Sequence, residues 1–347
     1  MTEQRSHKRR APSLEDVARI AGVNRVTASI ALRRGSRDTT REGTRISEAT
    51  RQRVVEAADS LGYSPNAIAL ALRRQSTGLI GFYGGYGEWM NAHLPFIAEL
   101  INGLQFGCVK RQHHLLFYTG FEDHTVDERY RILANGSIDG LIVFPAPSHI
   151  ALLERLAHSH VPLIAIANPQ PAIPSVTVDN AHGSYLLAEH LAAQGHRRVL
   201  YRCGNFDHTS ASIRRNAFLE AAQKFGLEVI ISPPETLPGN LTAFERELLQ
   251  QPRQQRPTAA VCWEDMSAYI LLQDCERYGI TVPDDLAIVG FDGIETRIHP
   301  CRSLTTIRAP WNKVAETATD LLLDLIHGRG VAPETILPVS LVVGDTA

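Results

Sequence analysis

The stretch "LEDVARIAGVNRVTASIAL", residues 14–32, has the pattern of two short helices separated by a single glycine. Ser13 precedes it as a good helix N-cap, and Asp16, three residues later, completes a pattern typical of a capping box. Gly22 can end the first helix, because glycine readily adopts the left-handed conformation. The first helix gathers its apolar side chains on one face, namely Leu14, Val17, Ala18 and Ala21.

The second helix of this unit should begin after Asn24, a good N-cap, and run from Arg25 to about Arg33. A third helix should begin near Ser47 and end at Gly62. Two helices joined by a short glycine-containing turn have the spacing of a helix-turn-helix motif. The three helices would enclose a small core, made of Val17, Ala21, Val23, Ala28, Val54 and Leu61.

This head is basic, whereas the rest of the chain is acidic. Residues 1–75 carry 15 Arg and Lys against 8 Asp and Glu, a balance of +7, and the remaining residues carry 20 against 29, a balance of −9. Arginines alternate with apolar residues as far as Arg74, which a solvated basic tail would not explain. The head is therefore expected to bind a polyanion.

Beyond residue 79, short apolar and β-branched runs alternate with helical patterns. Helices are predicted over 96–109, 184–194 and 213–225. Such an alternation predicts parallel sheets. The predicted strands are "LIGFY" at 79–83, "HLLFY" at 114–118, "GLIVF" at 140–144, "PLIAIA" at 162–167, "RRVLYRCG" at 197–204, "AAVCW" at 259–263 and "LAIVGF" at 286–291.

Length and composition exclude several classes of protein. The 347 residues predict two or three domains. No apolar run reaches the roughly 18 residues of a membrane span, and no apolar segment follows the N-terminal charges, so we expect a cytoplasmic protein. The five cysteines are scattered and form no CxxC pair, which favours reduced thiols over a zinc site.

An enzyme would need a nucleophile and base within reach, or a cofactor motif. The sequence holds no GxSxG and no HExxH, and the glycines that follow the first strand do not have GxGxxG spacing. We therefore expect no catalysis, no cofactor and no metal. The alternative is a sugar-binding protein without a DNA role, but a transport protein of that kind would need a signal peptide and would lack the basic head.

Motifs along almost the whole chain resemble the lactose-repressor (LacI/GalR) family of bacterial transcription factors. They are "LEDVARIAGVN", "ATRQRVVEAADSLGYSPNAIALAL", "GHRRV", "PDDLAIVGFDG" and "SLTTIR", in the family's order. The resemblance implies an all-α helix-turn-helix head and a hinge helix, followed by an α/β body of two parallel-sheet sub-domains, like that of periplasmic sugar-binding proteins. The implied domains are 1–65 for DNA binding, 66–78 for the hinge, and 79–347 for ligand binding and dimerisation, with sub-domains 79–178 with 308–336 and 179–307 with 337–347.

In helix-turn-helix domains of this kind the second helix lies in the major groove of double-stranded operator DNA. Arg25, Val26 and Ile30 match the family's base-reading positions; Arg25 can contact guanine, and the two apolar side chains can contact a thymine methyl. Arg25 could instead be a solvated surface arginine, and Ile30 a core residue. The positions that match phosphate contacts are Asn24, Thr27, Ser29 and Arg33. The loop at 33–45 is longer than the family's usual one.

Residues 66–74 resemble the family's hinge helix. Because short helices are marginal alone, this one is expected to form only when two copies pair on DNA. Leu72 matches the leucine that wedges between base steps from the minor groove, and Arg73 matches a neighbouring minor-groove position. The resemblance therefore implies a homodimeric repressor of a palindromic operator.

The body is expected to hold a small-molecule effector, a carbohydrate, beyond the carboxyl ends of its strands. Arg214 matches the family's ligand-clamping arginine. Carboxylates with Trp311 as an aromatic side chain that can stack on a sugar face, and with Phe96 as the opposite wall, suit polyhydroxylated ligands. Each of these residues could instead form a structural ion pair or a core contact. Ala167 and Asn168 stand where many relatives have an acid and an arginine. The effector candidates are Phe96, Arg214, Glu264, Asp265, Asp292 and Trp311.

Overall fold

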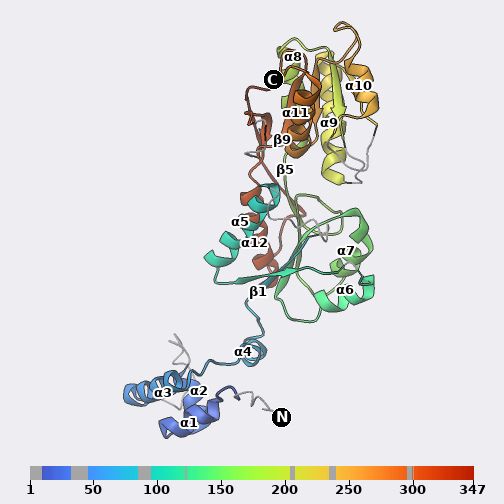
Figure 1. Ribbon diagram of the computed structural model, residues 1–347. Helices are drawn as coiled ribbons and strands as arrows, with labels where there is room; N and C mark the ends of the chain where they lie inside the picture. The colour runs from blue at the N-terminus through green and yellow to red at the C-terminus, as the bar shows by residue number, and fades with distance from the viewer. Residues whose placement is uncertain are drawn as a thin grey trace, which may run out of the picture. The chain divides into compact units, whose positions relative to one another are not determined.

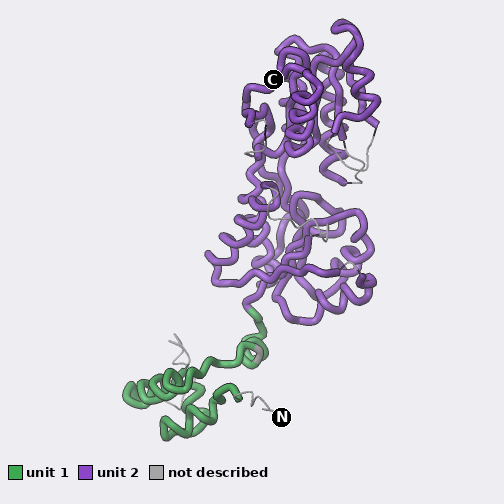
Figure 2. The backbone as a smooth tube through the Cα atoms, in the orientation of Figure 1, with its two compact units in different colours: residues 1–77 green, residues 78–347 purple. Residues whose placement is uncertain are grey.

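The chain is described by a computed structural model that divides into two compact units, Met1–Thr77 and Gly78–Ala347 (Figure 2). The structure describes residues 10–32, 46–84, 95–121, 123–203, 208–233, 240–294, 299 and 301–347. The side chain of Ile68 is also outside the description. Arg33 and the long loop at 33–45 therefore lie outside the described residues.

The first unit contains the predicted three helices, α1 (Leu14–Ala21), α2 (Arg25–Ala31) and α3 (Glu48–Leu61) (Figure 1). Ser13 and Asp16 form the predicted capping box, and Gly22 ends α1 with φ of 65°. Asn24 Oδ1 accepts a hydrogen bond from Thr27 N at 2.7 Å and so begins α2. The buried core consists of Val17, Ala18, Ala21, Ala28, Ala31, Val54, Ala57 and Ala58, with Val23 and Leu61 partly buried against it.

The hinge segment forms α4 (Ala67–Arg74), close to its predicted bounds. This helix is present in the single chain, whereas the sequence led us to expect it only in a pair on DNA. Its local chemistry explains the difference, because Asn66 Oδ1 accepts a hydrogen bond from Ala69 N and alanine and leucine favour the helix. None of its described side chains is buried.

The second unit begins with a six-stranded sheet in the order β11-β5-β4-β3-β1-β2, all of whose strand pairs are parallel. The helices α5 and α12 lie together on one side of it, and α6 and α7 lie together on the other (Figure 1). We call this sheet with its helices the first sub-domain. Its elements are β1 (Leu79–Gly84), α5 (Pro95–Lys110), β2 (His114–Tyr118), α6 (Val126–Leu133), β3 (Gly140–Phe144), η2 (Pro147–His149), α7 (Ile150–Ala157), β4 (Leu163–Ile166), β5 (Ser175–Val178), α12 (Trp311–Ile326) and β11 (Glu334–Leu337).

The second sub-domain is built on another six-stranded sheet, in the order β12-β10-β9-β8-β6-β7. Its pairs are parallel except that β12 runs antiparallel to β10. The predicted class of two α/β sub-domains is confirmed. The elements are α8 (Asn180–Ala193), β6 (Arg198–Arg202), α9 (Thr209–Phe225), β7 (Glu228–Ile231), α10 (Ala243–Leu249), β8 (Ala259–Cys262), α11 (Asp265–Tyr278), β9 (Ala287–Asp292), β10 (Thr305–Arg308) and β12 (Ser340–Val342).

The chain passes between the two sub-domains three times, after β5, after β10 and after β11. The central strands are buried along their whole length, as in β3, β4, β8 and β9. This burial on both faces is typical of parallel sheets that helices cover on each side. Among the described residues, no helix is long and apolar enough to span a membrane.

Candidate functional site

In the first unit, α2 has one buried face and one open face. Ala28 and Ala31 are buried in the core of the three helices, while Arg25 and Val26 are exposed, Val26 to 67%. Within the described residues the Arg25 guanidinium makes no hydrogen bond and no ion pair. At the start of α2, a large exposed apolar side chain thus lies next to a guanidinium without a bonded neighbour in the described residues. This combination is more typical of a surface that binds a partner than of a helix face that only contacts water.

The side chains of the other predicted DNA-contacting residues differ in exposure and in the hydrogen bonds that they already make. Ser29 and Ile30 are half-buried. The Asn24 side chain is already engaged as the cap of α2, where its carbonyl oxygen accepts from the Thr27 backbone N–H. The Arg51 guanidinium, which the sequence did not single out, donates to Ala31 O at 2.9 Å and satisfies a carbonyl at the end of α2.

In α4, Leu72 is 77% exposed and Arg73 is exposed beside it. A leucine in this position has no apolar neighbourhood to enter among the described residues. Transfer of such a side chain out of water is worth about 1.5–3 kcal/mol. The helix therefore presents an apolar side chain to whatever partner covers it.

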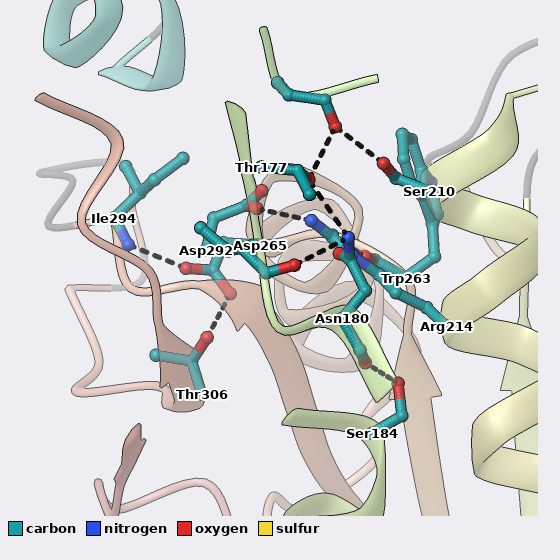
Figure 3. A network of polar contacts seen from close by, with 12 residues as sticks. Thr177, Asn180, Ser184, Ser210, Arg214, Trp263, Asp265, Asp292, Ile294 and Thr306 are labelled. Atoms are coloured by element: carbon teal, nitrogen blue, oxygen red, sulfur yellow. Dashed lines mark hydrogen bonds and ion pairs between the residues drawn. The ribbon is translucent and has the colours of Figure 1, made fainter. Parts of the chain in front are cut away.

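In the second unit, a polar network surrounds Arg214 on α9 (Figure 3). Its Nε donates to Asn180 Oδ1 at 2.8 Å, its Nη1 donates to Trp263 O at 2.7 Å, and its Nη2 lies 3.3 Å from Asp292 Oδ1. The guanidinium also lies over the Phe291 ring, 3.6 Å from its centroid. Arg214 and Asp292 come from elements that the sequence predicted, and the structure brings them together.

Asp292 ends β9, at the carboxyl edge of the second sheet, and is buried. Its φ of 133° lies where residues with a side chain are rarely found. Burial raises the pKa of its carboxyl group above the ordinary value, and the Arg214 guanidinium opposes that rise. The aspartate is therefore held at this edge by backbone geometry and by its cation together.

Asp265, at the start of α11, has a different environment. It is 0% exposed, and both carboxylate oxygens are occupied: Oδ1 accepts from Thr306 Oγ1 at 2.5 Å and Oδ2 accepts from Ile294 N at 2.7 Å (Figure 3). Burial and the neighbouring Asp292 carboxylate raise its pKa. Among the predicted effector residues, Asp265 therefore uses its carboxylate oxygens to hold the turn after β9.

Glu264 lies beside these groups but is half-buried, and its carboxylate caps no backbone N–H of α11. Burial and the neighbouring Asp292 carboxylate raise the pKa of Glu264 to about 8. A carboxyl group with such a pKa can donate a hydrogen bond as well as accept one near neutral pH.

The two predicted aromatic residues lie against each other. Phe96 on α5 and Trp311 on α12 have ring centroids 5.0 Å apart with planes at 87°, and Trp311 is buried. They form one wall, on the side of the first sub-domain, and not two opposite walls.

Several contacts at the site were not predicted from the sequence, where Ala167 and Asn168 stood out only as departures from the family's pattern. Asn168 Oδ1 accepts from Thr209 N at 3.0 Å and Ser210 Oγ donates to Ala167 O at 2.6 Å, so the start of α9 is bonded to the end of β4 in the other sub-domain. His208, next to them, is buried, and burial together with the Arg214 charge lowers its pKa to about 3. The described residues include no cluster of three or more His, Cys, Asp or Glu side chains that could hold a metal ion.

Residues 13–66 match the model of the lacI family of bacterial regulatory proteins, and residues 188–347 match a periplasmic binding protein-like domain. The transcriptional repressor PurR of Vibrio parahaemolyticus is 30% identical over 325 residues, which cover 91% of this chain and 92% of that protein. PurR of Photobacterium profundum is 29% identical over 327 residues, with coverage of 91% and 92%.

Two solved structures share the fold. The lac repressor dimer bound to operator and the anti-inducer ONPF has a TM-score of 0.78 at 24% identity, covering 97% of this chain and 99% of that one. The complex of the transcriptional regulator CelR with cellobiose has a TM-score of 0.66 at 24% identity, covering 97% and 100%.

Proposed function

Because this chain belongs to the lacI family of bacterial regulatory proteins and is a DNA-binding transcriptional regulator, we propose that it represses as a dimer on a palindromic operator under the control of a carbohydrate effector. The observation that carries the DNA-binding part is the open face of α2. Arg25 and Val26 stand in water on a helix whose other face is buried. We assign Arg25 to a base contact, with Val26 and Ile30 as apolar contacts.

Selection of bound sites from a randomised duplex pool tests the operator. The proposal expects a palindrome whose half-sites lie about one helical turn apart. Arg25→Ala should relax the preference at one base pair per half-site, a loss of about 1–3 kcal/mol of discrimination. Arg53→Ala, which removes an exposed charge from α3, is the control and should weaken binding to all sequences alike. Unchanged selectivity in Arg25→Ala would refute the assignment of that residue to a base contact.

The dimer is supported by exposed apolar side chains that a single copy leaves unpaired. Leu72 and its helix α4 are exposed, and α5 exposes Phe106 to 60% and Val109 to 75%. We propose that α4 pairs with its copy on DNA and that Leu72 enters the minor groove there. Sedimentation of the operator complex should give two chains per palindrome, and a single chain on DNA would defeat this part.

The carbohydrate effector is supported by the groups around Arg214. Three of the five guanidinium N–H groups are used by the contacts with Asn180, Trp263 and Asp292. The remaining donors, the Asp292 carboxylate and the Glu264 carboxyl can pair with adjacent hydroxyls, while the Phe96–Trp311 wall supplies an apolar surface. In this assignment Asp265 positions the turn after β9 and does not contact the ligand.

A thermal-shift screen of the full chain against sugars, sugar acids and glycosides tests the effector. A ligand at about 100 times its Kd raises the unfolding free energy by about 2.7 kcal/mol, which gives a measurable shift. The proposal requires that a ligand found in this way also changes operator affinity. A panel in which only compounds without hydroxyl groups bind would refute the carbohydrate class.

A further inference from the structure

The carboxyl group of Glu264 lies beside the Arg214 network but takes no part in its bonding. Glu264 stands two residues after the end of β8, at the carboxyl edge of the second sheet, and is half-buried. Within the described residues its side chain makes no hydrogen bond and no ion pair. Asp292 and Asp265, by contrast, are both bonded to other groups of the network (Figure 3). Glu264 can therefore use its carboxyl group for a ligand.

The charges around Glu264 favour a positive partner. In the part of the chain that the structure describes, the carboxylates of Asp292 and Asp265 destabilise its ionised form, and the Arg214 guanidinium stabilises it. That guanidinium is already paired, because its Nη2 lies 3.3 Å from Asp292 Oδ1 and its Nη1 donates to Trp263 O at 2.7 Å. An ionised Glu264 would thus be a partly buried charge without a counter-ion of its own among the described residues, which is costly.

The carboxyl group avoids this cost by keeping its proton. Burial, followed by the Asp292 charge, raises the pKa of Glu264 to about 8, so most of this group is neutral at pH 7. A positive charge within about 4–6 Å favours the ionised form of a carboxyl group, whereas a neutral hydroxyl brings no charge. Binding of a cation next to Glu264 is therefore coupled to the release of a proton.

A second polar group of the site also lacks a partner. The His208 side chain is 6% exposed, and its Nδ1 makes no hydrogen bond in the described part of the chain. Burial, together with the charge of nearby Arg214, lowers the pKa of this imidazole to about 3. The ring is therefore neutral at pH 7, and one of its nitrogens accepts a hydrogen bond. An acceptor of this kind suits a ligand that carries N–H donors.

We propose that the carbohydrate effector is an amino sugar, whose ammonium group pairs with the Glu264 carboxylate. This inference rests on the proposed carbohydrate effector and narrows it to one chemical class. The hydroxyls of the sugar pair with Arg214 and Asp292, and its ring lies against the Phe96–Trp311 wall. A sugar acid would bring another negative charge to the three carboxyl groups, and like charges disfavour one another.

Calorimetric titration of the full chain with matched sugars tests the proposal. The pairs are glucosamine with glucose, galactosamine with galactose, and mannosamine with mannose; glucuronate and galacturonate represent the acids. In at least one pair, the amino sugar should bind about tenfold more tightly than its neutral partner, because charge-assisted hydrogen bonds are roughly twice as strong as neutral ones. The acids should not bind.

Proton release gives a readout that a purely structural role of Glu264 would not produce. Titration at about pH 6.5, in buffers of different ionisation enthalpy, measures how many protons leave on binding. At this pH most of Glu264 carries its proton and the amine is charged. The wild-type protein should therefore release about one proton with the amino sugar and none with the neutral sugar.

Glu264→Gln keeps the size and the hydrogen-bonding groups of the neutral acid but cannot ionise. It should abolish the proton release and weaken the amino sugar about tenfold, while the neutral sugar binds as it does to wild type. Glu276→Gln removes an exposed acid from the same helix, α11. It is the matched control and should change neither result.

The outcomes separate this inference from the proposed function. A neutral sugar that binds as tightly as its amino partner overturns the amino-sugar assignment and leaves the carbohydrate effector in place. An amino sugar that binds without proton release, or that keeps its affinity in Glu264→Gln, does the same. The wild-type measurements decide the result even if the variant does not fold. If no sugar of the panel binds, the inference and the carbohydrate effector are refuted together.

Discussion

Replacing Arg214 by methionine, which keeps much of the stem and removes the charge, should destabilise the body in a pH-dependent way. The change leaves Asn180 Oδ1, Trp263 O and Asp292 Oδ1 without the donors they now have. Breaking a buried ion pair by removing one partner costs about 3–5 kcal/mol. We therefore expect a loss of about that size near pH 8 in the free energy of unfolding.

The sign of the pH dependence follows from Asp292. Burial raises its pKa in the folded protein above the unfolded value, so the folded state holds the proton more tightly and the unfolding free energy falls as pH rises from about 4. Arg214 opposes this rise, and without it the pKa of Asp292 must be higher still. The difference between wild type and variant should therefore be smaller near pH 5, where only the lost hydrogen bonds to Asn180 Oδ1 and Trp263 O contribute, and should grow as the pH increases through the folded pKa of wild-type Asp292.

Urea unfolding at these two pH values measures the effect, with tryptophan fluorescence as the signal because Trp263 contacts the arginine. Arg215→Met, at the neighbouring half-buried position, is the control and should cost less than about 1 kcal/mol. A loss in Arg214→Met below about 1 kcal/mol, or one equal at both pH values, would refute the description of the site as a buried, charge-balanced network. At low temperature, where the variant stays folded, operator binding should persist and the response to effector should be lost.

Three further outcomes are expected. Leu72→Ser should weaken binding to the selected operator far more than binding to random duplex, measured by titration at fixed salt; equal losses would exclude a wedge. Asn24→Ala should lower the unfolding free energy of the first unit by about 1 kcal/mol through loss of the α2 cap, and an unchanged thermal midpoint would contradict this. Gly290→Ala should destabilise the body severely, since the added Cβ would lie 2.2 Å from Asp265 Oδ1; a wild-type midpoint would refute that packing.

Local signals in the sequence were sufficient for the head. Ser13, Asn24 and Gly22 act through hydrogen bonds and dihedral angles within three or four residues, so the helix ends could be predicted. All seven predicted strands are present, but β5, β7, β10, β11 and β12 were not predicted. These are three or four residues long and three of them lie at sheet edges, where burial is partial and periodicity too short to recognise.

The candidate site was only partly predictable for a related reason. Arg214 and Asp292 follow from strand and helix ends together with the family resemblance. Asn180 and Asn168 do not, because their partners lie 34 and 41 residues away and depend on how the sub-domains are placed. The separate roles of Glu264 and Asp265 depend on burial, which two adjacent acids in a sequence do not reveal.

The two hydrogen bonds between the end of β4 and the start of α9 have a consequence for switching. Each hydrogen bond stabilises the contact between the sub-domains by a net of about 0.5–1.5 kcal/mol. Ala167 has a φ of 63°, and this left-handed backbone conformation costs about 1 kcal/mol. The two hydrogen bonds between the sub-domains are thus weak enough to break by thermal motion. Allosteric coupling is usually worth about 1–3 kcal/mol, which is on the order of these two hydrogen bonds together. A metabolite that favours one arrangement of the sub-domains by that amount is sufficient to shift the equilibrium between arrangements.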